Sequence, residues 1–287
     1  ATFPSHVMRL AGEFLRQPDF LSLSRDHIHV AETEHVFYIV PGMEKERSLV
    51  RIIEIENPTG AIIFCNTKAT VSFVATVLKR FGYDAAELTA DLTQRAREQT
   101  MGRLREKNLR LLVATDLAAR GIDIPELSHI IQYEPPEDPE AYIHRAGRTG
   151  RAGASGEAVT LVNVLEKSEL QRIASRFDID MIERPLPTDN DVSAIVSQRI
   201  TALLEAQLRS RDNLQVERMQ RFVPLARELG ESDDGSSLIA MLLDDYYQQT
   251  LYAPPPQPPS ESSQERKIID KKRSDRKPRR SPPRKRR

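Results

Sequence analysis

The sequence has little cysteine and no long apolar run, and these two absences exclude whole classes of protein. Cys65 is the single cysteine among 287 residues, so a disulfide framework and a cysteine-rich zinc site are both excluded. This composition agrees with a reducing compartment. No apolar run approaches the roughly 20 residues that span a bilayer, so we expect no membrane partner. No signal peptide is visible and the chain begins with Ala1 rather than Met, so we expect a fragment or a processed product.

A phosphate-binding motif is also missing. No Gly-Lys pair occurs in the chain, which excludes the loop Gly-x-x-x-x-Gly-Lys-Ser/Thr that cradles nucleotide phosphates. We assign no metal ligands to the chain either. Any phosphate chemistry must therefore use other groups or a loop from elsewhere.

Charge is distributed unevenly along a chain whose formal net charge is +0. Residues 264–287 contain 13 Lys and Arg against 3 Asp and Glu, which leaves 29 basic and 39 acidic residues in the rest. An acidic body with a basic tail favours a polyanionic partner. A tail that only increases solubility is the alternative.

Short apolar segments alternate with amphipathic segments of ten or more residues between positions 30 and 187. Predicted strands are 35–40, 61–66, 87–88, 109–114, 129–133, 157–163 and, at an edge, 180–183, and predicted helices are 44–56, 69–81, 93–106, 138–146 and 166–177. This alternation indicates βαβ units, and strands that are apolar on both faces indicate a parallel sheet covered on both sides. We therefore predict a doubly wound α/β domain over 30–187. Before it we expect a short helix with Ser5 as N-cap and a short strand at 20–24.

The composition changes after Pro185 and Pro187. Three helical patterns with apolar residues three and four apart follow within 188–252, at 192–208, 216–225 and 238–251. About 60 residues make a thin core, so we expect a small all-α domain that packs on the α/β domain or on a second copy. The Pro-rich and basic residues 253–287 cannot bury enough apolar surface to fold, which predicts a disordered linker and basic tail.

Two stretches hold the candidate chemistry. NLRLLVATDLAARGID (108–123) is a buried strand followed by a polar loop, and YIHRAGRTGR (142–151) is a helix followed by a glycine-rich loop. Loops at strand ends are where open parallel sheets bind ligands. Gly147 and Gly150 allow close backbone approach, and Arg148 and Arg151 are charged forks that suit phosphate. These residues predict a phosphate-binding face, although an isolated Arg-Thr-Gly-Arg is more often a surface loop.

With AIIFCNTK (61–68), these stretches resemble the motifs of the second RecA-like lobe of superfamily 2 helicases, and specifically of DEAD-box RNA helicases. The resemblance covers about residues 1–186. The initial ATFP resembles the family's Ser-Ala-Thr motif, which makes 1–29 a remnant of the first lobe and the inter-lobe linker. Less specifically, 188–252 resembles the dimerisation region of bacterial cold-shock-type members, which implies a homodimer through 190–252 and a role in stress response.

The resemblance implies which residues approach ATP. Arg148 and Arg151 would be arginine fingers on the γ-phosphate, and His144 would sense the first lobe's catalytic carboxylate. Asp123 would accept hydrogen bonds from the ribose hydroxyls, and Arg120 would bridge the RNA and ATP surfaces. Arg145, by contrast, is expected to be a structural partner of a nearby acid.

The resemblance also implies RNA-backbone contacts, from Asn66, Thr67, Gln94, Arg97, Thr115 and Gly121. Ordinary helix capping is the alternative for Asn66 and Thr67, and loop capping is the alternative for Asp116. The family usually has His-Gly-Asp shortly before its Gln-x-x-Arg, but here Thr89, Ala90 and Asp91 occupy those positions. Only Asp91 carries over from that motif. Cys65 is expected to be a buried small side chain rather than a nucleophile.

The function implied is that of an ATP-dependent RNA helicase that separates short duplexes. No Asp-Glu-Ala-Asp occurs, so ATP and Mg²⁺ would be held mainly by the missing first lobe, and the chain alone is expected not to hydrolyse ATP. The alternatives are a non-catalytic RNA-binding and dimerisation module and a DNA helicase or remodeller. We expect a cytoplasmic location, with a nuclear signal in RRSPPRKRR as the alternative.

Overall fold

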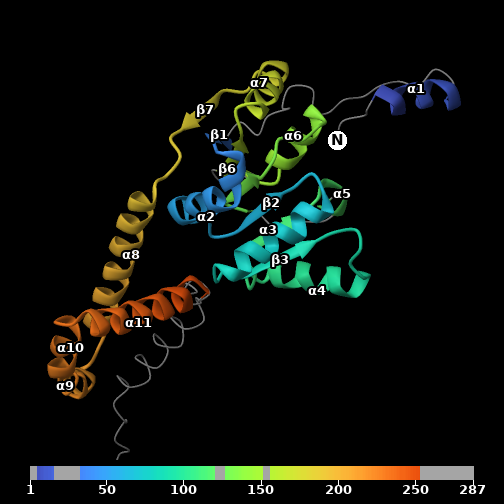
Figure 1. Ribbon diagram of the computed structural model, residues 1–287. Helices are drawn as coiled ribbons and strands as arrows, with labels where there is room; N and C mark the ends of the chain where they lie inside the picture. The colour runs from blue at the N-terminus through green and yellow to red at the C-terminus, as the bar shows by residue number, and fades with distance from the viewer. Residues whose placement is uncertain (1–4, 16–32, 120–126, 151–155, 253–287) are drawn as a thin grey trace, which may run out of the picture. The chain divides into compact units, whose positions relative to one another are not determined.

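A computed structural model describes residues 5–15, 33–119, 127–150 and 156–252. The chain divides into two units, Ala1–Tyr252 and Ala253–Arg287, and every described residue belongs to the first. Within the described residues the centre of that unit is a seven-stranded sheet in the order β3-β4-β2-β5-β6-β1-β7 (Figure 1). All six strand pairs are parallel, which confirms the predicted α/β class.

The strands match the predicted apolar segments closely. They are β1 (Thr33–Ile39), β2 (Ala61–Phe64), β3 (Ala85–Leu88), β4 (Leu111–Ala114), β5 (His129–Gln132), β6 (Gly156–Val162) and β7 (Met181–Arg184). All four residues of β2 and of β4 are buried, as expected for interior strands of a sheet covered on both faces. β7 lies at the edge beside β1, as the sequence predicted.

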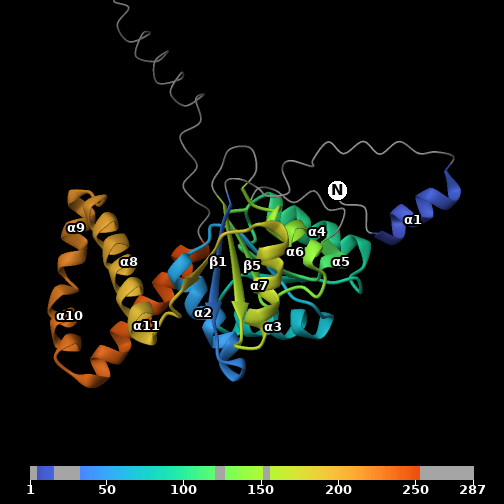
Figure 2. The ribbon, with the colours of Figure 1, turned by 90° about the horizontal axis from the view of Figure 1, so that it is seen from above.

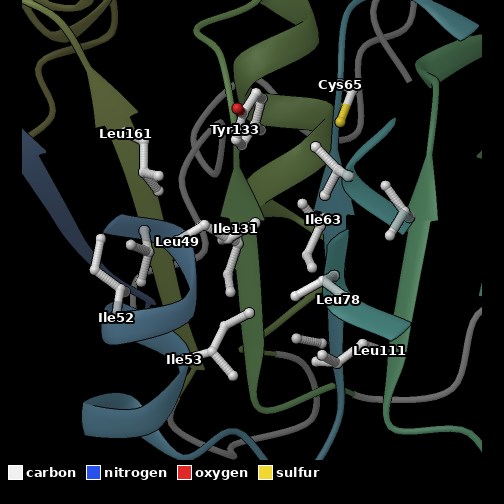
Figure 3. Close-up of a cluster of buried hydrophobic side chains, with 14 of the residues drawn as sticks. Leu49, Ile52, Ile53, Ile63, Cys65, Leu78, Leu111, Ile131, Tyr133 and Leu161 are labelled. Atoms are coloured by element: carbon white, nitrogen blue, oxygen red, sulfur yellow. The ribbon is translucent and has the colours of Figure 1, made fainter. Parts of the chain in front are cut away.

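One face of the sheet is covered by α2 (Lys45–Glu56) and α3 (Lys68–Arg80). Leu49, Ile52 and Ile53 of α2 pack over the middle strands (Figure 3). Alternate strand residues such as Ile63 and Ile131 point to this side, because successive side chains of a strand face opposite ways. Cys65 is fully buried in the same cluster, which confirms the expected small core side chain.

The other face is covered by α4 (Gln94–Arg105), α5 (Asp116–Ala119), α6 (Pro139–Ala146) and α7 (Glu166–Phe177). Ile62 and Phe64 of β2 pack here with Met101 and Leu104 of α4. Tyr142 of α6 packs with residues of β1, β6 and α7. Figure 2 shows α2 on one side of β1 and α7 on the other. The sheet is therefore doubly wound, as predicted.

The described residues between the sheet and Tyr252 form four helices instead of the three predicted. They are α8 (Asp189–Arg209), α9 (Asn213–Gln220), α10 (Val223–Gly230) and α11 (Asp233–Tyr252). The predicted 216–225 helix is wrong, because the chain breaks between α9 and α10 at Arg221 and Phe222. Pro224 lies in the first turn of α10, where proline is tolerated, whereas inside a continuous helix it would remove a backbone hydrogen bond.

The start of the chain differs slightly from the prediction. α1 (Ser5–Phe14) begins at Ser5, so Ser5 is the first helical residue rather than the N-cap before it. Helix ends defined from hydrogen bonds and from sequence commonly differ by a residue or two. The predicted strand at 20–24 lies outside the described residues. Among the helices of the described residues, none combines the length and apolar character needed to cross a bilayer.

Candidate functional site

The candidate site lies at the carboxyl edge of three neighbouring strands. Asn66 follows β2, Thr115 and Asp116 follow β4, and Glu134 follows β5, and β4, β2 and β5 are adjacent in the sheet. The carboxyl ends of parallel strands meet at one edge. Asn66 and Glu134, which are 68 positions apart in the chain, are thereby brought together. Helix α6 adds a fourth segment to the loops after β2, β4 and β5.

Arg145 of α6 is the centre of this arrangement. Its guanidinium donates to both carboxylate oxygens of Asp116, at 2.8 and 2.7 Å, and to Oδ1 of Asn66 at 2.8 Å. It also donates to the Glu134 carbonyl at 3.0 Å and lies 5.3 Å from the centre of the Phe64 ring. One side chain therefore bonds the loops after β2, β4 and β5, and the expected partnership of Arg145 with a nearby acid is confirmed.

The energetics of Arg145 follow from its burial. Its side chain is 1% exposed, whereas that of Asp116 is 42% exposed. A buried guanidinium is costly unless its donors are satisfied, and here the bidentate carboxylate and three further acceptors, on Asn66, Gln132 and Glu134, satisfy them. Loss of the carboxylate would leave a buried charge without its counterion, which typically costs about 3–5 kcal/mol.

Local sequence explains why α6 presents Arg145 here. Asp138 caps the helix by accepting from the Glu140 N–H at 3.0 Å, and Pro139 occupies the first turn, a combination typical of a helix start. Tyr142 is fully buried, and its hydroxyl lies 3.0 Å from Nδ1 of His35 on β1. Burial raises the pKa of the Tyr142 hydroxyl above its usual range, so it remains protonated.

The loop after α6 carries the predicted phosphate ligands. His144 is exposed and Arg148 is half-buried, and the two are separated by about one helical turn. Thr149 is fully buried, and its hydroxyl donates to the Leu127 carbonyl, which fixes the loop at its base. Gly150 has φ 63°, a left-handed conformation that glycine adopts without strain.

The predicted RNA contacts differ in their accessibility. Thr67 is exposed and caps α3, accepting from the Thr70 N–H at 3.1 Å. Gln94 is exposed at the start of α4 and donates to Glu98 at 2.7 Å. Arg97 donates to the Ala118 carbonyl at 2.8 Å, so it holds α4 against α5.

Asn66 and Thr115 are more enclosed. The Asn66 amide also donates to the Pro135 carbonyl at 2.9 Å, which satisfies both ends of the side chain. Thr115 is 8% exposed, and its Oγ1 lies 3.4 Å from the Ala118 N–H. For these two residues the described side chains stabilise the loops, and the RNA contacts stay predictions.

Four predicted site residues, Arg120, Gly121, Asp123 and Arg151, lie outside the described residues. Asp91, which carries over from the family's His-Gly-Asp, pairs with Lys68 at 2.5 Å. Both members of that pair are exposed, so it contributes little stability.

The chemistry of the described edge fits an anionic phosphate. The side chains of Arg148 and His144 carry nitrogen donors, whereas the backbone N–H groups of residues 147–149 already donate to carbonyls of α6. Both oxygens of Asp116 are bonded to Arg145, so the charge of this carboxylate is balanced within the lobe. Burial raises the pKa of the Cys65 thiol well above its usual range, which excludes a thiolate nucleophile beside the site.

The sequence prediction did not single out Glu134 and Gln132. The Glu134 carboxylate accepts from the Asn66 backbone N–H at 3.1 Å, and Gln132 is fully buried beside Arg145. Only their position in the sequence could have identified these two residues. Both lie at the end of β5, a strand whose carboxyl end was predicted to share an edge with that of β2.

Comparison with known proteins agrees with this geometry. The family "Helicase conserved C-terminal domain" matches residues 44–153. RNA helicase CrhR of Synechocystis is 36% identical over 241 residues, which is 84% of this chain and 48% of CrhR. The chain thus spans about half the length of such relatives.

Solved structures show the same relationship. The C-terminal domain of the DEAD-box protein Dbp5 is 31% identical and has a TM-score of 0.54, with 59% of this chain and 99% of that chain covered. S. cerevisiae Dbp5 bound to RNA and ADP BeF3 is 30% identical with a TM-score of 0.60, covering 69% of this chain and 53% of that chain. The chain belongs to the DEAD-box RNA helicase family and contains its C-terminal RecA-like lobe.

Proposed function

We propose that this chain is the second half of an ATP-dependent RNA helicase that separates short RNA duplexes. In this proposal it supplies one face of an active site whose other face belongs to a first RecA-like lobe. The observation that carries the proposal is the position of Arg145, which joins Asn66 and Asp116 to the helix that precedes Arg148.

This arrangement supports a coupling of RNA and ATP binding. The loops after β2 and β4 contain the predicted RNA contacts Thr67 and Thr115, and α6 leads to the predicted ATP contact Arg148. Because one buried guanidinium holds these segments together, a shift of the RNA-binding loops would move α6. RNA and ATP would then both favour the closed pairing of the two lobes, through their higher affinity for it. RNA contacts would be to phosphate and sugar, and therefore independent of base sequence.

Arg148 and Arg151 are the proposed arginine fingers. A phosphoryl group that is being transferred spreads negative charge over its oxygens, and a fixed guanidinium stabilises that charge. Arg120 and Asp123 are proposed contacts of the nucleotide, and His144 is proposed to meet the first lobe. Mg²⁺ and the phosphate cradle would come from that lobe, because the chain lacks the motifs for both.

The test is RNA-stimulated ATP hydrolysis by the whole protein that contains this chain. Arg148→Ala should lower kcat by about a thousandfold, the usual effect of removing an arginine finger. Arg172→Ala, which removes an exposed arginine of α7, is the control and should retain activity. The isolated chain should show no RNA-stimulated hydrolysis. Full activity of Arg148→Ala would contradict the assignment, and activity of the isolated chain would contradict the shared site.

We also propose that helices α8–α11 form a homodimer. Large apolar side chains on these helices and at the break between α9 and α10 are exposed among the described residues, each at 49–76%, namely Leu208, Leu214, Phe222, Leu225, Leu238, Met241 and Leu242. Such residues occur singly on most surfaces, but a group of this size indicates an interface. Dimerisation with RNA capture by residues 253–287 would also serve the alternative, non-catalytic function. A cytoplasmic location and a role in stress response remain part of the proposal through the cold-shock resemblance.

A further inference from the structure

A second polar cluster lies on the α2 side of the sheet, at the opposite, amino edge. His129 of β5 is the register partner of Glu157 of β6, which in turn is the partner of Glu34 of β1. Partners in parallel strands point to the same face, so these three side chains form a row. Glu56, the last residue of α2, reaches the same row from the helix above it.

The cluster contains more carboxylates than its paired cation can neutralise. Arg184 of β7 contacts Glu157 at 2.7 Å, Glu56 at 2.9 Å and Glu34 at 3.1 Å. It binds Oε1 of Glu157 and Oε1 of Glu56. The second oxygen of Glu157 instead faces the imidazole of His129, with 3.8 Å between Oε2 and Nε2.

The hydrogen bond at Nδ1 of the His129 imidazole determines whether Nε2 carries a proton or a lone pair. The Ser128 hydroxyl donates its single proton to the Gly60 carbonyl at 3.0 Å. With that proton directed to Gly60, we assign Ser128 as the acceptor at its 2.9 Å contact with Nδ1 of His129, which puts the imidazole proton on Nδ1. The neutral imidazole then directs its Nε2 lone pair towards a carboxylate oxygen. Two acceptors that face each other at 3.8 Å in an enclosed site are better satisfied when a cation or a proton lies between them.

The spacing of the three ligand atoms suits a metal ion. One atom each from Glu56, His129 and Glu157 lie within 4.8 Å of one another. Tetrahedral Zn²⁺ with bonds of about 2.0–2.1 Å holds its ligands roughly 3.4 Å apart. Small side-chain rotations would shorten these separations to the distance that Zn²⁺ needs, because β5 and β6 already hold His129 and Glu157 side by side. The bond from Nδ1 to Ser128 is the kind of outer contact that orients a ligating histidine.

We propose that Glu56, His129 and Glu157 form a binding site for a first-row transition-metal dication such as Zn²⁺. One imidazole and two carboxylates favour such an ion over Mg²⁺, which prefers oxygen ligands and keeps its waters. The ion would join the end of α2 to β5 and β6, on the edge away from the RNA and ATP face. Sequence spacing gives no sign of this site, because its three residues are far apart in the chain.

The experiment is titration of the chelator-treated 287-residue chain with Zn²⁺ by calorimetry, with Mg²⁺ in parallel. We expect one saturable Zn²⁺ site and a higher melting temperature with Zn²⁺. His129→Asn should weaken the Zn²⁺ affinity at least tenfold, whereas the control His6→Asn should leave it unchanged. Absence of a saturable site in the unmodified chain, or equal affinity in folded His129→Asn, would overturn the proposal.

Two further measurements decide the case in which His129→Asn fails to fold. Glu56→Gln retains the size of the side chain and should also weaken Zn²⁺ binding at least tenfold. Co²⁺ bound to the unmodified chain should give the visible absorption of a low-coordinate nitrogen and oxygen site, and Zn²⁺ should displace it. Unchanged affinity in Glu56→Gln, or an octahedral Co²⁺ spectrum, would overturn the proposed three-residue site.

Discussion

At the scale of single residues, burial decides what a charged side chain does in this lobe. Arg145 and Arg148 lie three positions apart in one motif, yet Arg145 is buried in a network of acceptors and Arg148 is half-exposed beyond the helix. The sequence prediction already gave Arg145 a structural role beside an acid and Arg148 a role at phosphate. The structure confirms the pairing of Arg145 with Asp116, and the role of Arg148 stays a prediction.

The Arg145–Asp116 pair should show strong energetic coupling. Asp116→Asn should lower the free energy of unfolding by about 3 kcal/mol, because it leaves a buried guanidinium without its counterion. Arg145→Met should also destabilise, but the double variant should lose at least about 2 kcal/mol less than the sum of the two single changes. Urea unfolding of all four proteins measures the coupling.

The pair Asp84–Arg103 is the matched control, because it has the same chemistry at 2.8 Å but is 31% and 43% exposed. Asp84→Asn should cost less than about 1 kcal/mol. Equal effects at the two pairs, or additive losses in the Arg145 cycle, would show that Arg145 is not the centre of the edge.

Glu157 should make stability depend on pH. Burial, and then the nearby Glu56 carboxylate, raise its pKa from 4.5 to about 7. The folded state therefore binds this proton more tightly than the unfolded state does, so the stabilisation is present at low pH and is lost as pH rises from about 4.5 to 7. The loss should be about 1–2 kcal/mol, less than the full shift implies because the group is partly hydrated.

Comparison with Glu157→Gln isolates this effect. Urea unfolding in a chelating buffer at pH 5 and pH 8 should show a larger decrease for the unmodified chain than for the variant, which has no carboxyl to titrate. If the free energy of unfolding changes equally with pH in the two proteins, the pKa of Glu157 is near its ordinary value and the prediction is wrong.

At the scale of elements, local patterns predicted the sheet better than the helices that follow it. Four-residue apolar runs such as 61–64 and 111–114 have one stable place, the interior of a parallel sheet. The segment 216–225 had a helical apolar spacing, but Pro224 interrupts it, and backbone chemistry prevailed over periodicity. A thin helical region also lacks a core that would specify where its apolar faces pack.

Those apolar faces carry the dimer prediction. Light scattering of the chain should give twice the mass of 32.6 kDa at micromolar concentration. Leu225→Glu with Leu242→Glu should give a monomer, because charges at the centre of an interface are left unpaired and desolvated. Val164→Glu, at a residue 77% exposed on the sheet domain, is the control and should remain a dimer. A monomer mass for the unmodified chain at all concentrations would remove the proposal.

At the scale of the whole molecule, the sequence predicted the α/β class and the seven strands to within a few residues. It also predicted the sheet edge at which the described candidate residues lie, because these features depend on local pattern plus one topological rule. It did not predict the bonds of Arg145 to Asn66 and to the Glu134 carbonyl, nor the row formed by Glu34, Glu157 and His129. These contacts depend on strand order, and strand order is set by long-range packing that no local pattern contains. The sites of a doubly wound sheet are therefore predictable in place but not in detail.

The uneven charge of the chain leads to a prediction about RNA affinity. Residues 264–287 carry a net charge of +10, whereas the rest carries −10, so the lobe alone should attract RNA weakly and the tail should dominate at long range. Each phosphate that the tail neutralises releases counterions, with a slope of log K against log salt of about −0.7 per contact for single strands.

Deletion of 264–287 should therefore weaken RNA binding at low salt and flatten that slope by about 3, if roughly four to five contacts are lost. An equal-length tail with Ser in place of every Lys and Arg should behave like the deletion, because charge rather than tether length is responsible. An unchanged slope in fluorescence anisotropy between 50 and 200 mM salt, roughly the range over which such contacts are usually measured, would assign RNA binding to the lobe itself.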